Sequence, residues 1–220
     1  MTIVACLGLF VCAFLLGSIP WGVVISTVFY HTDVRDHGSG NIGTTNAMRT
    51  MGKVGGSAVF VLDFAKGLAS GALAVAAQQL FFADAVSGTT AISHSELVCI
   101  AFFGCILGHI FCPWLGFKGG KGIAVAVGCL FVTFGPVGAF IEIALFAVLV
   151  IATRYVSVGS IAAAVLCPFL SAYYFLYSDF APIGFVLCCI AVCVVIWAHR
   201  ENIRRLRTGS ENRIGSKNKG

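Results

Sequence analysis

The chain has 220 residues, of which 59% are hydrophobic and only 10% are charged, and its mean hydropathy is +0.97. A typical soluble domain is about a quarter charged, and a soluble fold would have too little polar surface to cover so much apolar side chain. The composition therefore excludes an ordinary soluble protein. It predicts an all-α bundle of transmembrane helices, each of which needs about 20 apolar residues.

Seven apolar runs predict a single integral membrane domain over residues 1–220, in which 200–220 form a basic tail. The runs lie near residues 3–29, 54–80, 96–112, 122–136, 138–153, 157–177 and 182–198. The first run has no basic segment before it and no small-residue cleavage pattern, so we expect a retained span, bent at Pro20. The fourth and fifth runs are short, which leaves open five or six spans with a re-entrant piece.

The ten cysteines are placed like hydrophobic residues. Nine lie within the apolar runs, Cys112 stands at the end of one, and no CxxC pair occurs. Buried cysteine behaves as a small hydrophobe, so we expect neither disulfides nor a metal site, and no cofactor.

The basic residues determine the predicted orientation. All 14 Lys and Arg fall in the segment 31–66, the loop 118–121, Arg154, or the tail from 200 onward, whereas the connections 81–95, 135–138 and 178–181 contain none. With seven spans these two groups lie on opposite sides. The positive-inside rule then places the N-terminus outside and the C-terminus in the cytoplasm. Topology thus accounts for the net positive charge, which gives no reason to expect nucleic-acid binding.

Glycine and short polar residues are concentrated in the first cytoplasmic stretch. Gly38 and Gly40 permit tight turns with exposed N–H groups, and Ser39, Asn41 and Asn46 add short hydrogen-bonding side chains. Nearby Arg49 supplies a planar fork suited to a phosphate. The alternative is a solvated interfacial loop.

The second stretch is a glycine-lysine loop directly before an apolar run. Gly119, Gly120 and Gly122 would allow main-chain N–H groups to cradle an oxyanion at a helix N-terminus, with charge from Lys118 and Lys121. The spacing does not match a Walker A motif. A lysine-flanked loop that contacts lipid headgroups is the alternative, but it gives no reason for the glycines.

The remaining candidates lie at the ends of spans or within one. His199 and Asn202 would share a helix face at i, i+3, and a neutral imidazole can accept a proton from a hydroxyl. The alternative is a basic helix held at the membrane surface by anionic lipid, and we assign some of the tail arginines to that role. Ser157 and Ser160 offer hydroxyls or a helix cap. Asp63 and Lys66 are expected to pair inside the bundle. Glu142 has no evident partner in the sequence.

Three anion-binding segments on one face favour an enzyme that joins a soluble phosphorylated substrate to a lipid. A transporter would place its polar groups near the bilayer midplane, on broken helices. A purely structural membrane protein would not need two basic, glycine-rich loops.

Three motifs closely resemble those of the bacterial acyl-phosphate:glycerol-3-phosphate acyltransferases. They are Gly38–Asn46 (GSGNIGTTN) with Arg49, Phe117–Gly122 (FKGGKG), and His199–Leu206 (HRENIRRL) with Gly209 and Glu211. Gly17–Pro20, Leu62–Gly67 and Tyr155–Ser160 are also similar, so the resemblance runs from about residue 17 to residue 211. Two departures are Pro113, which stands one residue later than usual, and Val125, which replaces a common Thr.

The resemblance implies transfer of a fatty acyl group from a long-chain acyl phosphate to the 1-hydroxyl of sn-glycerol 3-phosphate. Lysophosphatidic acid and phosphate would be the products, in the first step of phospholipid synthesis at the cytoplasmic face of a bacterial inner membrane. It indicates membrane lipid as a partner and names no protein partner.

These inferences define the expected site residues. The catalytic set is Ser39, Arg49, Lys121, His199 and Asn202; the substrate-binding set is Gly38, Gly40, Asn41, Asn46, Lys118, Gly119, Gly120, Gly122, Ser157 and Ser160; the structural set is Asp63, Lys66 and Glu211. The sequence leaves open which loop holds which phosphate, and whether the base is His199 or a phosphate oxygen of the substrate.

Overall fold

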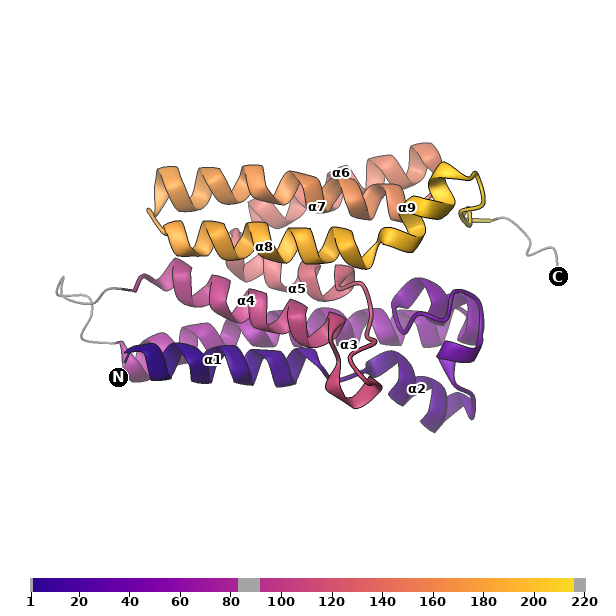
Figure 1. Ribbon diagram of the computed structural model, residues 1–220, viewed down its shortest axis with the longest axis horizontal. Coiled ribbons are helices and arrows are strands. Elements are labelled where there is room, and N and C mark those ends of the chain that lie inside the picture. Colours follow the sequence, from indigo (N-terminus) through magenta and orange to yellow (C-terminus); the bar gives the residue numbers. More distant parts are fainter. Residues whose placement is uncertain (1, 83–91, 216–220) are drawn as a thin grey trace.

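A computed structural model describes residues 2–82 and 92–215, and all the regular structure in these residues is helical (Figure 1). Most of the predicted 81–95 connection and the last five residues of the tail lie outside the described part. The elements are α1 (Thr2–Gly17), α2 (Trp21–Tyr30), the short turn η1 (Val34–Asp36), α3 (Thr44–Phe81), α4 (His94–Ile110), the turn η3 (Pro113–Leu115), α5 (Ile123–Thr133), α6 (Gly135–Thr153), α7 (Val156–Ala172), the wide turn η4 (Tyr173–Ser178), α8 (Pro182–Ala198) and α9 (Arg200–Arg207).

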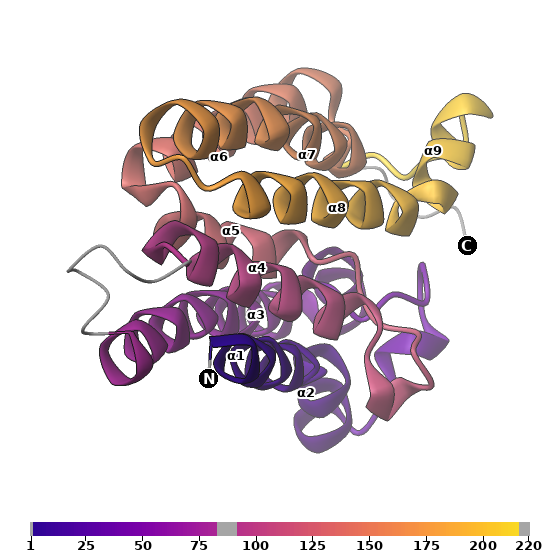
Figure 2. The ribbon, with the colours of Figure 1, turned by 60° about the vertical axis from the view of Figure 1, so that its left-hand side comes forward.

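The long helices lie side by side along the longest axis of the molecule (Figures 1 and 2). One group contains α1, α3 and α4, and the other contains α6, α7 and α8. The two groups are joined where α4 packs against α8 and where α5 packs against both α3 and α6. Many large apolar side chains on the outside of the bundle are exposed, which is the surface that a bilayer, rather than water, would cover.

Each predicted apolar run contains a helix, but the runs do not all have the length of a span. Five helical stretches are long and apolar enough to cross a membrane, and the pair α8–α9, bent by 52°, makes a sixth. The 11 residues of α5 rise only about 16 Å, against a hydrocarbon core of about 30 Å. The fourth predicted run is therefore a short inner helix, and a full count of seven crossings stays a prediction.

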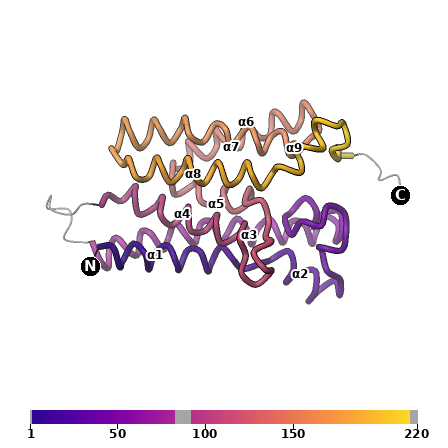
Figure 3. The backbone as a smooth tube through the Cα atoms, in the orientation of Figure 1, coloured from indigo at the N-terminus to yellow at the C-terminus, as the bar shows by residue number. Residues whose placement is uncertain are grey.

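Breaks in the helices fall close to where the sequence indicates them. The first run is divided between α1 and α2 at Ser18–Pro20, which the path of the backbone in Figure 3 shows as a change of direction. A second break lies inside α3, where Gly52 has φ 72°, just before the predicted start of the second span. These breaks leave α2, η1 and the first turns of α3 grouped at one end of the bundle.

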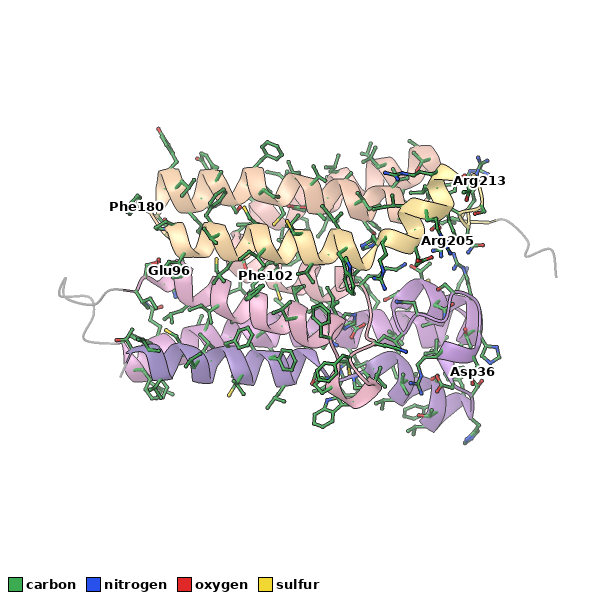
Figure 4. All side chains as sticks on the ribbon, viewed as in Figure 1. Asp36, Glu96, Phe102, Phe180, Arg205 and Arg213 are labelled. Atoms are coloured by element: carbon green, nitrogen blue, oxygen red, sulfur yellow. The ribbon has the colours of Figure 1, made fainter. Side chains whose placement is uncertain are left out.

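The two ends of the bundle differ in charge. Figure 4 shows Asp36, Arg205 and Arg213 at one end and Glu96 and Phe180 at the other. The basic connections before α3 and α5, after α6 and in α9 all lie at the first end (Figure 1). This grouping agrees with the separation expected from the sequence, while the side of the membrane that each end faces stays a prediction.

Candidate active site

A cavity of about 180 Å³ opens at the basic end, where four separate segments of the chain converge. The loop before α3, the start of α5, the start of α7 and the α8–α9 junction with the following tail contribute to its wall. It brings together all five predicted catalytic residues. The sequence-predicted residues that line it are Ser39, Asn41, Asn46, Arg49, Asp63, Lys121, Gly122, Ser157, Ser160, His199, Asn202 and Glu211.

The side chain of Asn46 organises the first loop. Its Oδ1 accepts a hydrogen bond from the N–H of Ser39 at 2.8 Å, and its Nδ2 donates to the carbonyl oxygens of Val34 and His37 at 2.8 and 3.0 Å. Gly38 has φ 59°, and a Cβ there would lie 2.3 Å from Asn46 Oδ1. The predicted substrate-binding residues Asn46 and Gly38 therefore shape the loop that presents Ser39.

The glycine pair of the second loop packs against the end of α4. The N–H of Gly119 donates to the carbonyl of Ile110, and that of Gly120 donates to the carbonyl of His109, each at 3.0 Å. A Cβ on Gly119 would lie 1.9 Å from the carbonyl oxygen of His109, and one on Gly120 would lie 2.1 Å from its Nε2. In this structure α4 therefore occupies both N–H donors, and the glycines are needed for close packing. The binding of substrate by Gly119 and Gly120 stays a prediction.

The two lysines of the same loop differ in position. Lys118 is exposed and is not among the described residues that line the cavity, whereas Lys121 lines it. Gly122, Ile123 and Ala124, where α5 begins, line it as well. The first N–H groups of a helix and its positive end favour an anion, so the anion-binding part of this loop is Lys121 together with the start of α5.

Positive charge is concentrated at the cavity. Burial, together with the positive charges of Arg205 and Arg49 and against the opposing charge of Glu211, lowers the pKa of Lys121 to about 8. Arg49 and Arg205 also line the wall. At neutral pH the wall therefore carries three cations, of which Arg205 is paired with the Glu211 carboxylate. The excess positive charge suits a phosphate.

His199 is held in one tautomer at the junction of α8 and α9. Its Nδ1 lies 2.8 Å from the carbonyl oxygen of Val195, so Nδ1 carries the proton and Nε2 keeps its lone pair. Burial is the main reason that the pKa of this imidazole falls to about 4, and the charge of Lys121 lowers it too, against the hydrogen bond to Val195. The ring is therefore neutral at pH 7 and can accept a proton.

Glu211 joins the tail to two helices. Its Oε1 accepts hydrogen bonds from Asn202 Nδ2 at 2.8 Å and Ser157 Oγ at 3.1 Å, and its Oε2 pairs with Arg205 Nε at 2.7 Å. Burial would raise the pKa of Glu211, but the hydrogen bonds from Asn202, Arg205 and Ser157 outweigh it and lower the pKa. The carboxylate thus orients Asn202, whose buried Oδ1 has no hydrogen-bond partner among the described residues.

A buried ionic network lies beneath the glycine loop. Lys66 Nζ is 2.9 Å from Asp63 Oδ1, which confirms the predicted pairing of these two residues in the bundle interior. Lys66 Nζ also lies 3.0 Å from His109 Nδ1 and donates to the carbonyl of Ile19 at 2.7 Å. The network connects α3 to the end of α4, on which the glycine loop packs.

Sequence reasoning missed several residues of the wall. Arg205 was not among the expected site residues, and it belongs to the tail arginines of which some were assigned to lipid contact. It lines the cavity and pairs with Glu211, and its i, i+3 spacing from Asn202 was the available signal. Thr44 belongs to the first motif but was not among the expected site residues; it lines the cavity with a buried Oγ1 that has no partner among the described residues. His109 gave no signal, because its partners are far away in the sequence.

A second, apolar chamber of about 190 Å³ adjoins the polar cavity. Phe60, Ile123, Phe146 and Ser160 line both spaces. The chamber continues between α5, α6, α7 and α8, and Phe102 of α4, which Figure 4 labels, closes one side. A charged cavity that opens into an apolar chamber can hold a molecule with a phosphate at one end and a hydrocarbon chain at the other.

Comparison with known proteins gives a consistent match over nearly the whole chain. Residues 7–209 match the family described as glycerol-3-phosphate acyltransferase. The chain is 39% identical over 214 residues to the glycerol-3-phosphate acyltransferase of Lacticaseibacillus casei, covering 97% of this chain and 93% of the relative. It is 36% identical over 215 residues to that of Rhodopseudomonas palustris, covering 96% and 98%.

Two solved structures share the fold. The crystal structure of PlsY (YgiH), an integral membrane glycerol 3-phosphate acyltransferase, in its glycerol 3-phosphate form, superposes with a TM-score of 0.78 at 34% identity, and covers 96% of each chain. The lysophosphatidic acid form superposes with a TM-score of 0.76 at 33% identity, and covers 96% of this chain and 95% of that one. The protein is therefore an integral membrane protein, and its chain belongs to the glycerol-3-phosphate acyltransferase family.

Proposed function

We propose that the protein transfers a fatty acyl group from a long-chain acyl phosphate to the 1-hydroxyl of sn-glycerol 3-phosphate, and releases lysophosphatidic acid and phosphate. The observation that carries this proposal is the junction of the two spaces, since the cationic cavity and the apolar chamber share four lining residues and lie side by side. One side suits the phosphates and the other suits the acyl chain. The relatives' names support glycerol 3-phosphate as acceptor.

In the proposed reaction the cationic wall holds the two phosphates. Arg49, Lys121, Arg205 and the start of α5 supply positive charge, and the acyl chain lies in the chamber with its carbonyl at the shared boundary near Ser160. Charge that develops on the carbonyl oxygen and on the leaving phosphate is stabilised by the same groups. An acyl phosphate is already activated, so the protein contributes mainly positioning and electrostatics.

His199 is the proposed base. The lone pair of its Nε2 takes the proton of the 1-hydroxyl as the oxygen attacks the carbonyl carbon and the carbon–phosphate oxygen bond breaks. Asn202 Oδ1, held by the Glu211 contact to its amide nitrogen, accepts a hydrogen bond from an acceptor hydroxyl. Proton removal by a phosphate oxygen of the substrate is the competing route, and the turnover of a His199→Gln variant separates the two.

The proposed location is a bacterial cytoplasmic membrane, with the cavity on the cytoplasmic side. The support is the gathering of the described basic residues at the cavity end of the bundle, together with the positive-inside rule. Glycerol 3-phosphate would enter from the cytoplasm, and the acyl chain would come from the bilayer or from a membrane-bound donor.

The test is an acylation assay with the purified protein. Glycerol 3-phosphate is incubated with palmitoyl phosphate, and in parallel with palmitoyl-CoA, and lysophosphatidic acid and phosphate are measured by mass spectrometry and a phosphate assay. We expect product from palmitoyl phosphate and none from palmitoyl-CoA. Product from palmitoyl-CoA alone would overturn the proposed donor, and product from neither would overturn the proposed reaction.

A further inference from the structure

A carboxyl group lies in the wall of the apolar chamber, where the reaction does not require one. Glu142 of α6 is only 3% exposed, it lines the chamber, and its Oε1 has no hydrogen-bond partner among the described residues. The chamber's other lining residues are apolar, with the exceptions of Ser160 at its mouth and Cys167. A carboxyl oxygen without a hydrogen-bond partner in such a place disfavours contact with hydrocarbon.

Glu142 lies at the depth that about the sixth carbon of an acyl chain would reach. Phe146 lines both spaces and packs against Gly159 of α7, and Glu142 lies four residues before it, which is about 6 Å deeper. The chamber reaches Cys167, seven residues beyond Ser160 and therefore about 10 Å from the mouth. An extended chain advances about 1.2 Å per bond. A hexanoyl chain thus stops near the level of Glu142, whereas a palmitoyl chain passes it.

Chains of different length change the surroundings of this carboxyl. When a short chain occupies the chamber, water can enter the remaining space and hydrogen-bond to Glu142. A long chain fills that space and leaves the group against methylenes. Removing the hydrogen-bond partners of a buried polar group lowers affinity by about tenfold or more.

We infer that Glu142 is a specificity-determining residue that reduces the enzyme's preference for long, fully apolar acyl chains. The inference rests on the proposed function, because it assumes that the donor chain occupies the chamber. Hydrocarbon burial still favours the binding of longer chains. Glu142 therefore reduces the favourable binding free energy that each added methylene near its carboxyl contributes.

The experiment compares kcat/KM for palmitoyl phosphate and hexanoyl phosphate, with glycerol 3-phosphate saturating, in the wild type, Glu142→Leu and Glu142→Gln. We expect the palmitoyl-to-hexanoyl ratio to rise about tenfold in Glu142→Leu. In Glu142→Gln the ratio should stay within about twofold of the wild type, because an amide also needs hydrogen-bond partners. Each ratio is measured on one preparation, so partial loss of folded protein cancels.

Glu96→Gln is the matched control. Glu96 is also a buried acidic side chain, but it accepts a hydrogen bond from the N–H of Ser93 at the start of α4, away from the chamber, so its substitution should not change the ratio. An unchanged ratio in Glu142→Leu, or an equal rise in Glu142→Gln, would overturn the inference. If the wild type turned over neither donor, the proposed function would fail instead, and the two failures are thereby distinguished.

Discussion

The shifted pKa of Lys121 predicts how activity depends on pH. Burial, with the charges of Arg205 and Arg49, lowers this pKa to about 8, and the proposed reaction needs the protonated amine to hold phosphate. Since a cation is lost as pH rises through its pKa, about nine-tenths of the amines are charged at pH 7 and about one-tenth at pH 9. We therefore expect kcat/KM to be level near neutrality and to fall about tenfold per pH unit above pH 8.

The assay measures phosphate release from palmitoyl phosphate between pH 6.5 and 10, with an enzyme-free blank for alkaline hydrolysis. In Lys121→Arg the guanidinium stays charged throughout this range, so the alkaline fall should disappear even where the overall rate is lower. Lys118→Met is the matched control, because Lys118 belongs to the same loop but is exposed and outside the wall. A fall that persists in Lys121→Arg, or that disappears in Lys118→Met, would refute the reasoning.

Three further predictions follow from the site. His199→Gln should lower kcat by about a hundredfold or more, because general-base catalysis contributes that much; near-normal turnover would eliminate the histidine as base and favour the substrate phosphate. Glu211→Ala should lower kcat/KM about tenfold or more, because Asn202 loses the acceptor that orients it, and an unchanged value would show that the tail contact is dispensable. Gly120→Ala should destabilise the protein by about 1–3 kcal/mol in thermal unfolding, since the methyl group would overlap the His109 ring. Gly8→Ala is the control, because a methyl group there meets no atom within 4 Å, and it should not destabilise the protein in this way. An equal loss of stability in both variants would contradict the packing role.

Helix positions and the charged end were predictable because they depend on properties local in the sequence. A bilayer requires long apolar runs and rejects charge, so the runs and the placement of Lys and Arg carry the information. The pairing of Asp63 with Lys66 was predictable for the same reason, since residues at i, i+3 on a helix are neighbours and an unpaired charge inside a bundle is costly.

The tertiary structure decided what depends on contacts between distant segments. The glycine loop looked like an anion cradle, but the carbonyls at the end of α4 occupy the N–H groups of Gly119 and Gly120. The sequence did not show which of the tail arginines contact lipid, and Glu211 holds Arg205 at the cavity. The apolar chamber with Glu142 in its wall exists only because six helices, α3 to α8, pack around it. The sequence by itself thus determined the membrane fold, the family resemblance and many of the residues that line the cavity. Packing determined which donors and charges remain available, because a hydrogen bond used within the protein is no longer available to a substrate.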